Sequence, residues 1–344
     1  MSSLQRLLGD GRDTSSEDNT SSSSEVYTYL APWAVYSFNF SSNPHYPFQL
    51  ALGSFIEDTN NSIQIIQLLP EQARFEVKTT IPHTYAPTKI MWIPDLEGSH
   101  PHLMATSSDH LRIWRQDESG LSSVSSLVNN RHSDYCGPIT SFDWNANDLT
   151  MIGTASIDST CTIWDIERQA MKKQILTHTK EVNDIAFGHD PNIFASVGAD
   201  GSVRRFDLRS LEQCTILYES QGYIPLLRLA WNKIDPNYIA IIMMDSPTVT
   251  ILDVRSPGMP LAVLQSHQNF VNAISWAPNS SCYICTAGDD RQALIWDLRR
   301  SLGEIREPMM VYNAEAEIIN LSWSVLQPNW VAIAYNKSLQ LLKL

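Results

Sequence analysis

The stretch HQNFVNAISWAPNSSCYICTAGDDRQALIWDL, residues 267–298, contains the pattern that decides the fold. It ends in a short apolar run closed by the aromatic-acidic pair Trp296–Asp297, and similar runs recur along the chain. The residues at the Trp position are Ile66, Trp114, Trp164, Phe206, Leu252, Trp296 and Leu342, with spacings of 48, 50, 42, 46, 44 and 46. A period of roughly 40 to 50 residues indicates stacked structural units, so the sequence predicts seven of them.

A second marker tests this number, because each unit also begins with a strand-like run that closes on an aromatic residue. These residues are Phe40, Trp92, Trp144, Phe187, Trp231, Trp276 and Trp323, each 19 to 26 residues before its partner in the first series. Turn signals such as DPN at 190–192 and QPN at 327–329 lie between the two markers. No long window has a helical period. The two markers interleave without a gap, which predicts an all-β protein.

This pattern resembles a WD-repeat β-propeller, whose blades have four strands each. The resemblance covers residues 25–344 and predicts a seven-bladed ring, because a single blade cannot bury both of its faces. The chain stops after the third strand of the last unit, so we expect EVYTYL (25–30) to supply the missing outer strand. Residues 1–24 contain eight Ser and are expected to form a disordered tail, because they cannot bury enough apolar area.

Composition excludes several other classes of protein. The chain has 24 Lys plus Arg against 37 Asp plus Glu, a formal net charge of −13, which disfavours general binding of nucleic acids or anionic membranes. No apolar stretch is long enough for a signal peptide or a membrane helix, so we expect a soluble intracellular protein. Five Cys do not suggest a disulfide framework, and the CxxC of Cys282 and Cys285 lacks the further ligands of a zinc site.

Several His, Ser, Thr and Asp residues of the repeats could be mistaken for the residues of a catalytic site. His267, Thr286, Asp290 and Trp296 are spaced as the buried hydrogen-bonded tetrad of WD repeats, and incomplete copies occur in other units. The copies are His178, Ser196 and Asp200 with Phe206; Thr154, Asp158 and Trp164 with Tyr135 in the His position; and His83 with Asp109 and Trp114. Repetition around the ring favours a structural role, since an active site needs one constellation. With no phosphate loop, nucleophile elbow or metal motif, we predict no catalytic, cofactor or metal site.

The amino-acid sequences of the individual repeats indicate a narrower family than the repeat pattern alone does. The stretches that carry it are LALGSFIEDTNN (50–61), PTKIMWIPD (87–95), PITSFDWN (138–145), SIDSTCTIWDIE (156–167), ADGSVRRFDLR (199–209), PLLRLAWNKIDPNY (225–238), ILDVRSP (251–257) and QALIWDL (292–298). They resemble the plant Transparent Testa Glabra proteins and, equally, their animal and fungal relatives, the cullin-four-associated WD-repeat factors. The resemblance implies non-enzymatic scaffolding of helix-loop-helix and MYB transcription factors or of dual-specificity tyrosine-regulated kinases.

A second kind of partner is implied by the residues that follow the Trp-Asp position. Cullin-four substrate receptors resemble one another in a W-D-x-R element that contacts the ligase adaptor, and here WDLR contains Asp297 and Arg299. FDLR with Arg209 and LDVR with Arg255 are related copies that depart at the Trp. An Arg past the third strand has a planar fork that can hold a carboxylate across an interface. The alternative is an ordinary surface Arg that pairs within its own blade.

Loops that lead into the inner strands are the other candidate interaction site, because loops on a rigid frame commonly carry recognition. The candidate anchors in these rim loops are Trp33, Tyr85, Tyr135, Glu181, Tyr223 and Phe270. We therefore predict an adaptor, monomeric on its own, that assembles transcription-factor or kinase complexes in nucleus and cytoplasm. A substrate receptor of a cullin-RING ubiquitin ligase is the first alternative, and an enzyme built on a propeller is a distant one.

Overall fold

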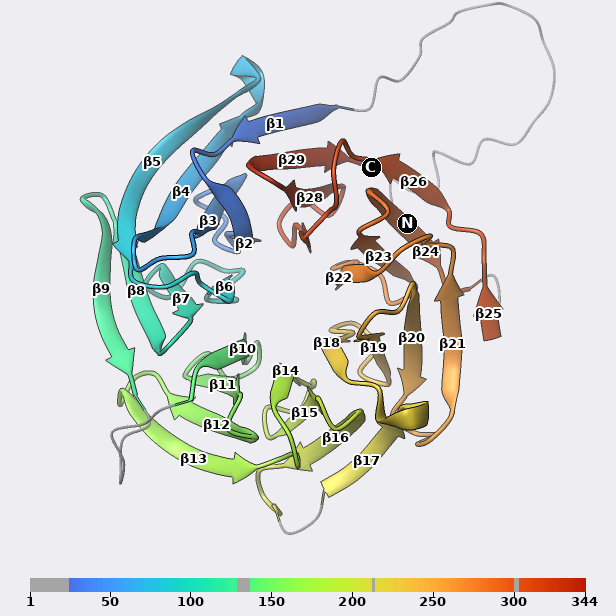
Figure 1. The fold of residues 1–344 in the computed structure, drawn as a ribbon. Helices are drawn as coiled ribbons and strands as arrows, with labels where there is room; N and C mark the ends of the chain where they lie inside the picture. Colours follow the sequence, from blue (N-terminus) through green and yellow to red (C-terminus); the bar gives the residue numbers. More distant parts are fainter. Residues whose placement is uncertain (1–24, 129–136, 212–213, 300–302) are drawn as a thin grey trace, which may run out of the picture.

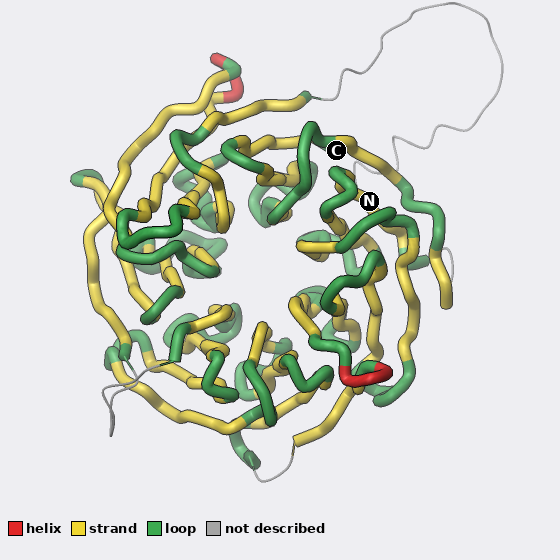
Figure 2. Tube along the Cα trace, in the orientation of Figure 1, coloured by secondary structure: helices red, strands yellow, loops and turns green. Residues whose placement is uncertain are grey.

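The computed structural model describes residues 25–128, 137–211, 214–299 and 303–344; the predicted tail at 1–24 and Tyr135 lie outside these ranges. The described chain forms seven sheets, antiparallel except for one strand pair in blade 5, arranged as blades around a central axis (Figure 1). Loops and two short helical turns, η2 (Pro70–Gln72) and η3 (Gln221–Tyr223), connect the strands (Figure 2). The seven-bladed all-β propeller predicted from the repeat is confirmed.

The first four blades each contain four consecutive strands, ordered from the axis outwards. Blade 1 contains β2 (Ala34–Phe40), β3 (Gln49–Phe55), β4 (Asn61–Leu69) and β5 (Arg74–His83). Blade 2 contains β6 (Lys89–Trp92), β7 (Leu103–Ser107), β8 (Leu111–Asp117) and β9 (Gly120–Leu127). Blade 3 contains β10 (Ile139–Trp144), β11 (Met151–Ser156), β12 (Thr160–Asp165) and β13 (Ala170–Leu176). Blade 4 contains β14 (Val182–Phe187), β15 (Ile193–Gly198), β16 (Ser202–Asp207) and β17 (Cys214–Glu219).

The last three blades depart from this simple order. Blade 5 contains β18 (Leu226–Trp231), β19 (Tyr238–Met243), β20 (Thr248–Asp253), β21 (Pro260–Gln265) and β25 (Gly303–Ile305). Blade 6 contains β22 (Val271–Trp276), β23 (Tyr283–Gly288), β24 (Gln292–Asp297) and β26 (Met310–Asn313). Blade 7 contains β27 (Asn320–Trp323), β28 (Trp330–Tyr335), β29 (Ser338–Lys343) and β1 (Val26–Leu30). The parallel pairing of β25 with β21, which the repeat pattern does not predict, covers the outer edge of blade 5 with residues from the connection inside blade 6.

Strand position within a blade follows the apolar pattern of the sequence. Every residue of β11 and of β28 is buried, because each middle strand is covered by a neighbouring blade on both faces. The outer strand β13 is mostly exposed, with only Ile175 buried. Continuous apolar runs therefore become middle strands, and mixed polar runs become outer ones.

Ring closure occurs between the two ends of the described chain, as the sequence predicts. Strand β1 pairs antiparallel with β29, in a register that places Val26 opposite Leu342 and Leu30 opposite Ser338. Tyr27 packs on Trp330 with ring centroids 5.7 Å apart. Blade 7 thus obtains its outer strand from the other end of the chain, and hydrogen bonds join the ring.

Because neighbouring strands within a blade are antiparallel, their connecting loops emerge alternately on two opposite faces of the propeller. The top face is defined here by the turns between the second and third strands and by the segments that lead into the inner strands. The bottom face carries the turns between first and second strands and those between third and fourth strands. Because all seven inner strands run in the same direction, equivalent residues of different blades emerge on the same face.

A buried histidine links blades 1 and 2 near the bottom face. His102 is sandwiched between Trp92 and Tyr46, with ring centroids 4.3 Å and 4.7 Å away, and its Nε2 lies 3.0 Å from Ser41 Oγ. Its Nδ1 and the Trp92 Nε1 have no hydrogen-bond partner among the described residues. Burial lowers the pKa of His102 to about 4, because the imidazolium form would lose its hydration.

This histidine predicts an acid-sensitive fold. The unfolded chain binds a proton near pH 6.5 and the folded chain only near pH 4, so His102 reduces stability as the pH falls through this window. The loss is expected to reach about 3 kcal/mol by pH 4. Urea unfolding at pH 7.5, 5.5 and 4.5 measures it, with His102→Phe as the variant that keeps the stack but cannot titrate. Equal pH dependence of the two proteins would contradict the prediction.

Candidate interaction surfaces on the two faces

The predicted tetrad of blade 6 is a connected hydrogen-bond network. His267 Nδ1 lies 2.8 Å from Asp290 Oδ2, and His267 Nε2 lies 2.7 Å from Thr286 Oγ1. The indole Nε1 of Trp296 donates to the same Thr286 hydroxyl at 2.9 Å. Burial by itself raises the pKa of Asp290, but the hydrogen bond and charge of His267 hold it below its usual value. The network ties the segment before β22 to β23, β24 and the turn between them, which is a structural arrangement.

The incomplete copies keep parts of this geometry in blades 3 and 4, and blade 2 is an exception. In blade 4, His178 bridges Asp200 and Ser196, each at 2.9 Å, and in blade 3 Trp164 donates to Thr154 at 3.0 Å. The pairing of His83 with Asp109 in blade 2 is wrong. His83 Nδ1 instead bonds the Tyr85 carbonyl.

The physical reason for the exception is a nearer partner for Asp109. Arg112 donates to Asp109 Oδ1 at 2.7 Å, and His110 Nδ1 lies 2.7 Å from Asp109 Oδ2. Thr106, which the sequence analysis did not select, takes the hydroxyl position and accepts from Trp114 at 2.9 Å. Arg112 thus takes the place of His83 as the partner of Asp109, while His83 Nε2 still lies 3.2 Å from Thr106 Oγ1.

Three arginines occupy equivalent positions on the bottom face of blades 4, 5 and 6. In each, Nε and Nη2 donate to the two oxygens of the aspartate two residues earlier, at 2.8 and 2.7 Å for Arg209, 2.9 and 2.6 Å for Arg255, and 3.0 and 2.9 Å for Arg299. The backbone N–H of each arginine also donates to that aspartate. The arginines therefore pair within their own blades, as the alternative interpretation expected, and still keep more than half of each side chain exposed.

These pairs fix the orientation of the guanidinium groups. The hydrogen bonds from Arg209 lower the pKa of Asp207 to about 2. In the equivalent pair of blade 5, Asp253 raises the pKa of Arg255. Arg299 also stacks on the Tyr283 ring, with its guanidinium carbon 5.0 Å from the centroid. The Nη1 group of all three has no hydrogen-bond partner among the described residues. The Nη1 edge of each guanidinium is thus free to bind a partner, and the paired aspartate fixes the direction in which it points.

Exposed apolar side chains accompany the arginines. Ile234 is 54% exposed and Met259 is 71% exposed, and both belong to bottom-face loops of blade 5, between the blades of Arg209 and Arg299. Blade 3 departs from the pattern, because Glu167 takes the arginine position and Asp165 pairs with Arg168 at 3.7 Å. Within the described chain, aspartate-held arginines at this position therefore occur in blades 4–6, and the two exposed apolar residues belong to bottom-face loops of the middle one of these blades.

The rim-loop candidates lie on the top face, with different degrees of exposure. Tyr223 is 70% exposed with a φ of 55°, a left-handed conformation that a tyrosine adopts at a cost in strain. Tyr85, Phe270 and Glu181 are exposed in the loops that lead into blades 2, 6 and 4. Trp33 is only half-buried and packs against the core between blades 1 and 7, while Tyr135 lies outside the described residues. No contact in the structure brings these candidates together into one site.

Metal and thiol chemistry have little support in the described ranges. Within these ranges, no group of three His, Cys, Asp or Glu side chains has the geometry to hold a metal ion. Burial raises the pKa of the Cys285 thiol to about 12, which disfavours the thiolate form that binds metals. None of the helical turns in the described chain has the length and apolarity to cross a bilayer.

The fold is that of a WD-repeat propeller with candidate interaction surfaces on its two faces. A family model described as WD domain, G-beta repeat matches residues 122–165, 171–207 and 258–297. The chain is 53% identical over 319 residues to the DDB1- and CUL4-associated factor 7 homolog of Dictyostelium discoideum, covering 92% of this chain and 98% of that protein. The chain belongs to the family of these DDB1- and CUL4-associated factor 7 homologs.

Fungal WD repeat-containing proteins are also similar. One from Schizosaccharomyces pombe is 34% identical, covering 93% of this chain and 90% of its own length. Another, from Saccharomyces cerevisiae, is 34% identical, covering 83% of this chain and 60% of its own length. These relatives support the cullin-four-associated branch of the predicted resemblance and do not support assignment to the Transparent Testa Glabra proteins.

Proposed function

We propose that the protein is a non-enzymatic adaptor that joins a cullin-four ubiquitin ligase through its bottom face and holds a recruited protein on its top face. The observation that carries this proposal is the row of aspartate-held arginines on blades 4–6. The printed name of the Dictyostelium relative, which records association with DDB1 and CUL4, supports the choice of partner. The three arginines are the W-D-x-R candidate Arg299 and its related copies Arg209 and Arg255, which the sequence analysis predicts as the ligase attachment site.

The geometry suits a protein interface in two ways. Each guanidinium is already held by its aspartate, so binding a carboxylate or carbonyl at the free Nη1 freezes little additional side-chain motion. Ile234 and Met259 supply apolar area beside the arginines, and interfaces combine such anchors with arginine at their energetic centres. The bottom face of blades 4–6 therefore offers both charge recognition and burial.

Replacing the arginines is expected to weaken attachment. Arg255→Ala should raise the Kd for purified DDB1 about tenfold, and the triple variant with Arg209→Ala and Arg299→Ala about 100-fold. Biolayer interferometry with the full chain measures both. Arg168→Ala is the matched control, because Arg168 lies on the bottom face of blade 3 and is 83% exposed. Its Kd should equal that of the wild type.

Two outcomes would contradict the proposal at different levels. If the wild type binds DDB1 and the triple variant binds equally well, the arginine row is not the attachment site. If the folded wild type does not bind DDB1 at all, the ligase function is wrong. Thermal unfolding of each variant shows that the propeller is intact, since the backbone N–H bonds to the aspartates remain.

Scaffolding of transcription factors or dual-specificity tyrosine-regulated kinases is a second candidate function, in both nucleus and cytoplasm. The sequence resemblance suggests these partners, and the exposed top-face aromatic residues Tyr85, Tyr223 and Phe270 favour a protein-binding role. Because this face is opposite the arginine row, the two functions are compatible. Pull-down with the triple arginine variant separates them: loss of DDB1 with retained kinase or transcription factor supports scaffolding by the top face.

A further inference from the structure

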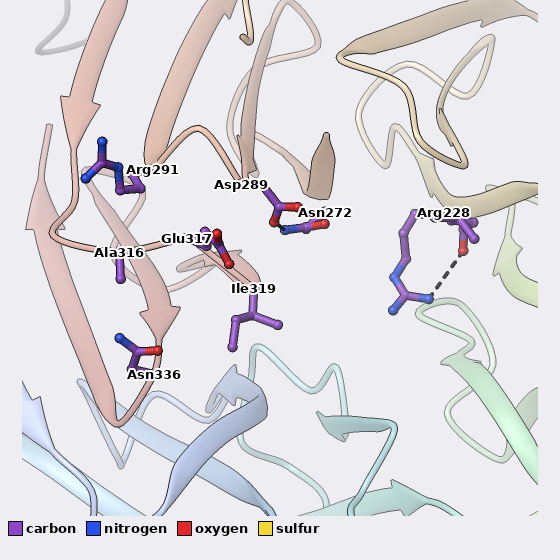
Figure 3. Close-up of a pocket in the computed structure, with 9 residues that line it drawn as sticks. Arg228, Asn272, Asp289, Arg291, Ala316, Glu317, Ile319 and Asn336 are labelled. Atoms are coloured by element: carbon purple, nitrogen blue, oxygen red, sulfur yellow. Dashed lines mark hydrogen bonds between the residues drawn. The ribbon is translucent and has the colours of Figure 1, made fainter. Parts of the chain in front are cut away.

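A hollow of about 770 Å³ lies at the top-face mouth of the central channel, over blades 5, 6 and 7. Its apolar lining comes from Leu227, Ala316 and Ile319. Its polar lining comes from Arg228, Asn272, Asp289, Arg291, Glu317 and Asn336 (Figure 3). This volume falls within the range of ligand-binding pockets in proteins.

The hollow occurs where a repeated contact between neighbouring inner strands is missing. Four residues before the inner-strand aromatic, a hydroxyl or amide reaches the next inner strand: Thr88 bonds the Ile139 carbonyl, Thr140 that of Val182, Asn183 that of Leu226 and Asn272 that of Ile318. In blades 1, 5 and 7 the same position holds Tyr36, Leu227 and Ile319. In blade 1 the neighbouring Ser37 bonds the Pro87 carbonyl instead, whereas Leu227 and Ile319, which cannot make the bond, both line the hollow.

The charged residues at this mouth lack charged partners. Glu317 is exposed and has neither a hydrogen bond nor an ion pair from its side chain among the described residues. Among the described residues, the side chain of Asp289 accepts a hydrogen bond only from the amide of Asn272, at 2.6 Å. Within the same part of the chain, the Arg228 guanidinium donates only to the carbonyl of Leu227, at 3.3 Å. Figure 3 places Asp289 and Glu317 between the two arginines, close to Asn272 and Ile319.

The top-face loops around the hollow carry many carboxylate side chains. Several carboxylates in its loops have no ion-pair partner among the described residues: Glu57, Asp58, Asp158, Glu181, Glu219, Asp245 and Glu315. In the described part of the same loops, the cations are chiefly Lys180, Arg291 and Lys337. The excess of carboxylates over cations among these described residues favours a cation over an anion near the hollow.

We propose that this hollow binds an arginine or lysine side chain from an extended segment of the protein recruited on the top face. The aliphatic stem would lie on Leu227 and Ile319, and the cationic head would reach Asp289 and Glu317. Arg228 and Arg291, on either side of the carboxylates, would donate to backbone carbonyls of the segment. The inference rests on the top-face recruitment of the proposed function and is independent of the ligase attachment.

A peptide probe tests the inference without the ligase. Full-length protein is titrated into a Gly-Leu-Arg-Leu-Gly-amide peptide that carries fluorescein on its N-terminal amine, and into the same labelled peptide with citrulline in place of Arg, which has nearly the same shape and no charge on that side chain. The arginine peptide should bind about tenfold more tightly, because only it places a cation on the carboxylates. The double variant Asp289→Asn/Glu317→Gln should remove this selectivity. Glu181→Gln, on the same face but outside the hollow, should retain it.

The outcomes distinguish this inference from the proposed function. Equal binding of the two peptides, or equal selectivity in the double variant, would overturn the cation site while leaving DDB1 attachment unaffected. Tighter binding of the corresponding glutamate peptide would overturn the sign of the recognised charge. Loss of DDB1 binding with retained arginine selectivity would overturn the ligase attachment alone.

Discussion

A variant that begins at residue 31 is expected to unfold roughly 7 °C below one that begins at residue 25. The difference is strand β1, whose five residues pair with β29 from Val26–Leu342 to Leu30–Ser338. Its loss removes the packing of Tyr27 and Tyr29 against the core between blades 1 and 7 and exposes the edge of β29. Burial of two such rings and the strand pairing are worth about 5 kcal/mol.

Differential scanning calorimetry of the two proteins gives this comparison directly. A second comparison, between the full chain and the variant that begins at residue 25, checks that residues 1–24 contribute little, as their composition predicts. Equal Tm values for the chains that begin at residues 25 and 31 would show that blade 7 does not depend on β1 for its stability.

His267→Ala is expected to lower the free energy of unfolding by about 3 kcal/mol. His267 is 6% exposed and is the residue that joins Asp290 to Thr286, so its removal leaves a buried carboxylate and a buried hydroxyl without that partner. Trp296 then donates to a hydroxyl that no longer has its second contact. The effect should therefore be larger than the loss of one isolated hydrogen bond.

The matched control is His189→Ala, because His189 is exposed and makes no side-chain hydrogen bond among the described residues. It should change the free energy of unfolding by less than about 0.5 kcal/mol in the same urea titration. His178→Ala should resemble His267→Ala, since His178 bridges Asp200 and Ser196 in the same way. A cost for His267→Ala as small as that of the control would exclude a structural role for the tetrad.

The features of the fold that could be predicted depend on residues that lie close together in the sequence. The two aromatic markers recur because every blade needs the same inner and third strand, so their spacing predicts the blade number and the closing role of residues 25–30. The tetrad of blade 6 was predicted for the same reason, as its members lie within a single repeat. In blade 2 the prediction failed, because Arg112 is a stronger partner for Asp109 than His83.

Contacts between blades explain what was not predicted. Strand β25 leaves blade 6 to pair with β21 of blade 5, which no repeat pattern indicates. The rim-loop candidates share a face but not a site, and Trp33 packs on the core as well as lying near the rim. The hollow was missed because Leu227 and Ile319 are ordinary apolar residues in their own repeats. Their role becomes visible only in the tertiary structure, where neither side chain can make the hydrogen bond to the next inner strand that other blades make.

The sequence by itself determined the propeller, its number of blades and the positions of the repeated polar residues, because each of these depends on interactions within one repeat. Only the tertiary structure decided that the arginines of blades 4–6 each leave one edge free on the face that also exposes Ile234 and Met259, and that the channel mouth opens over blades 5–7. The physical reason is that these surfaces combine residues from different blades. Their separation is set by closure of the ring and by which side chains join neighbouring inner strands.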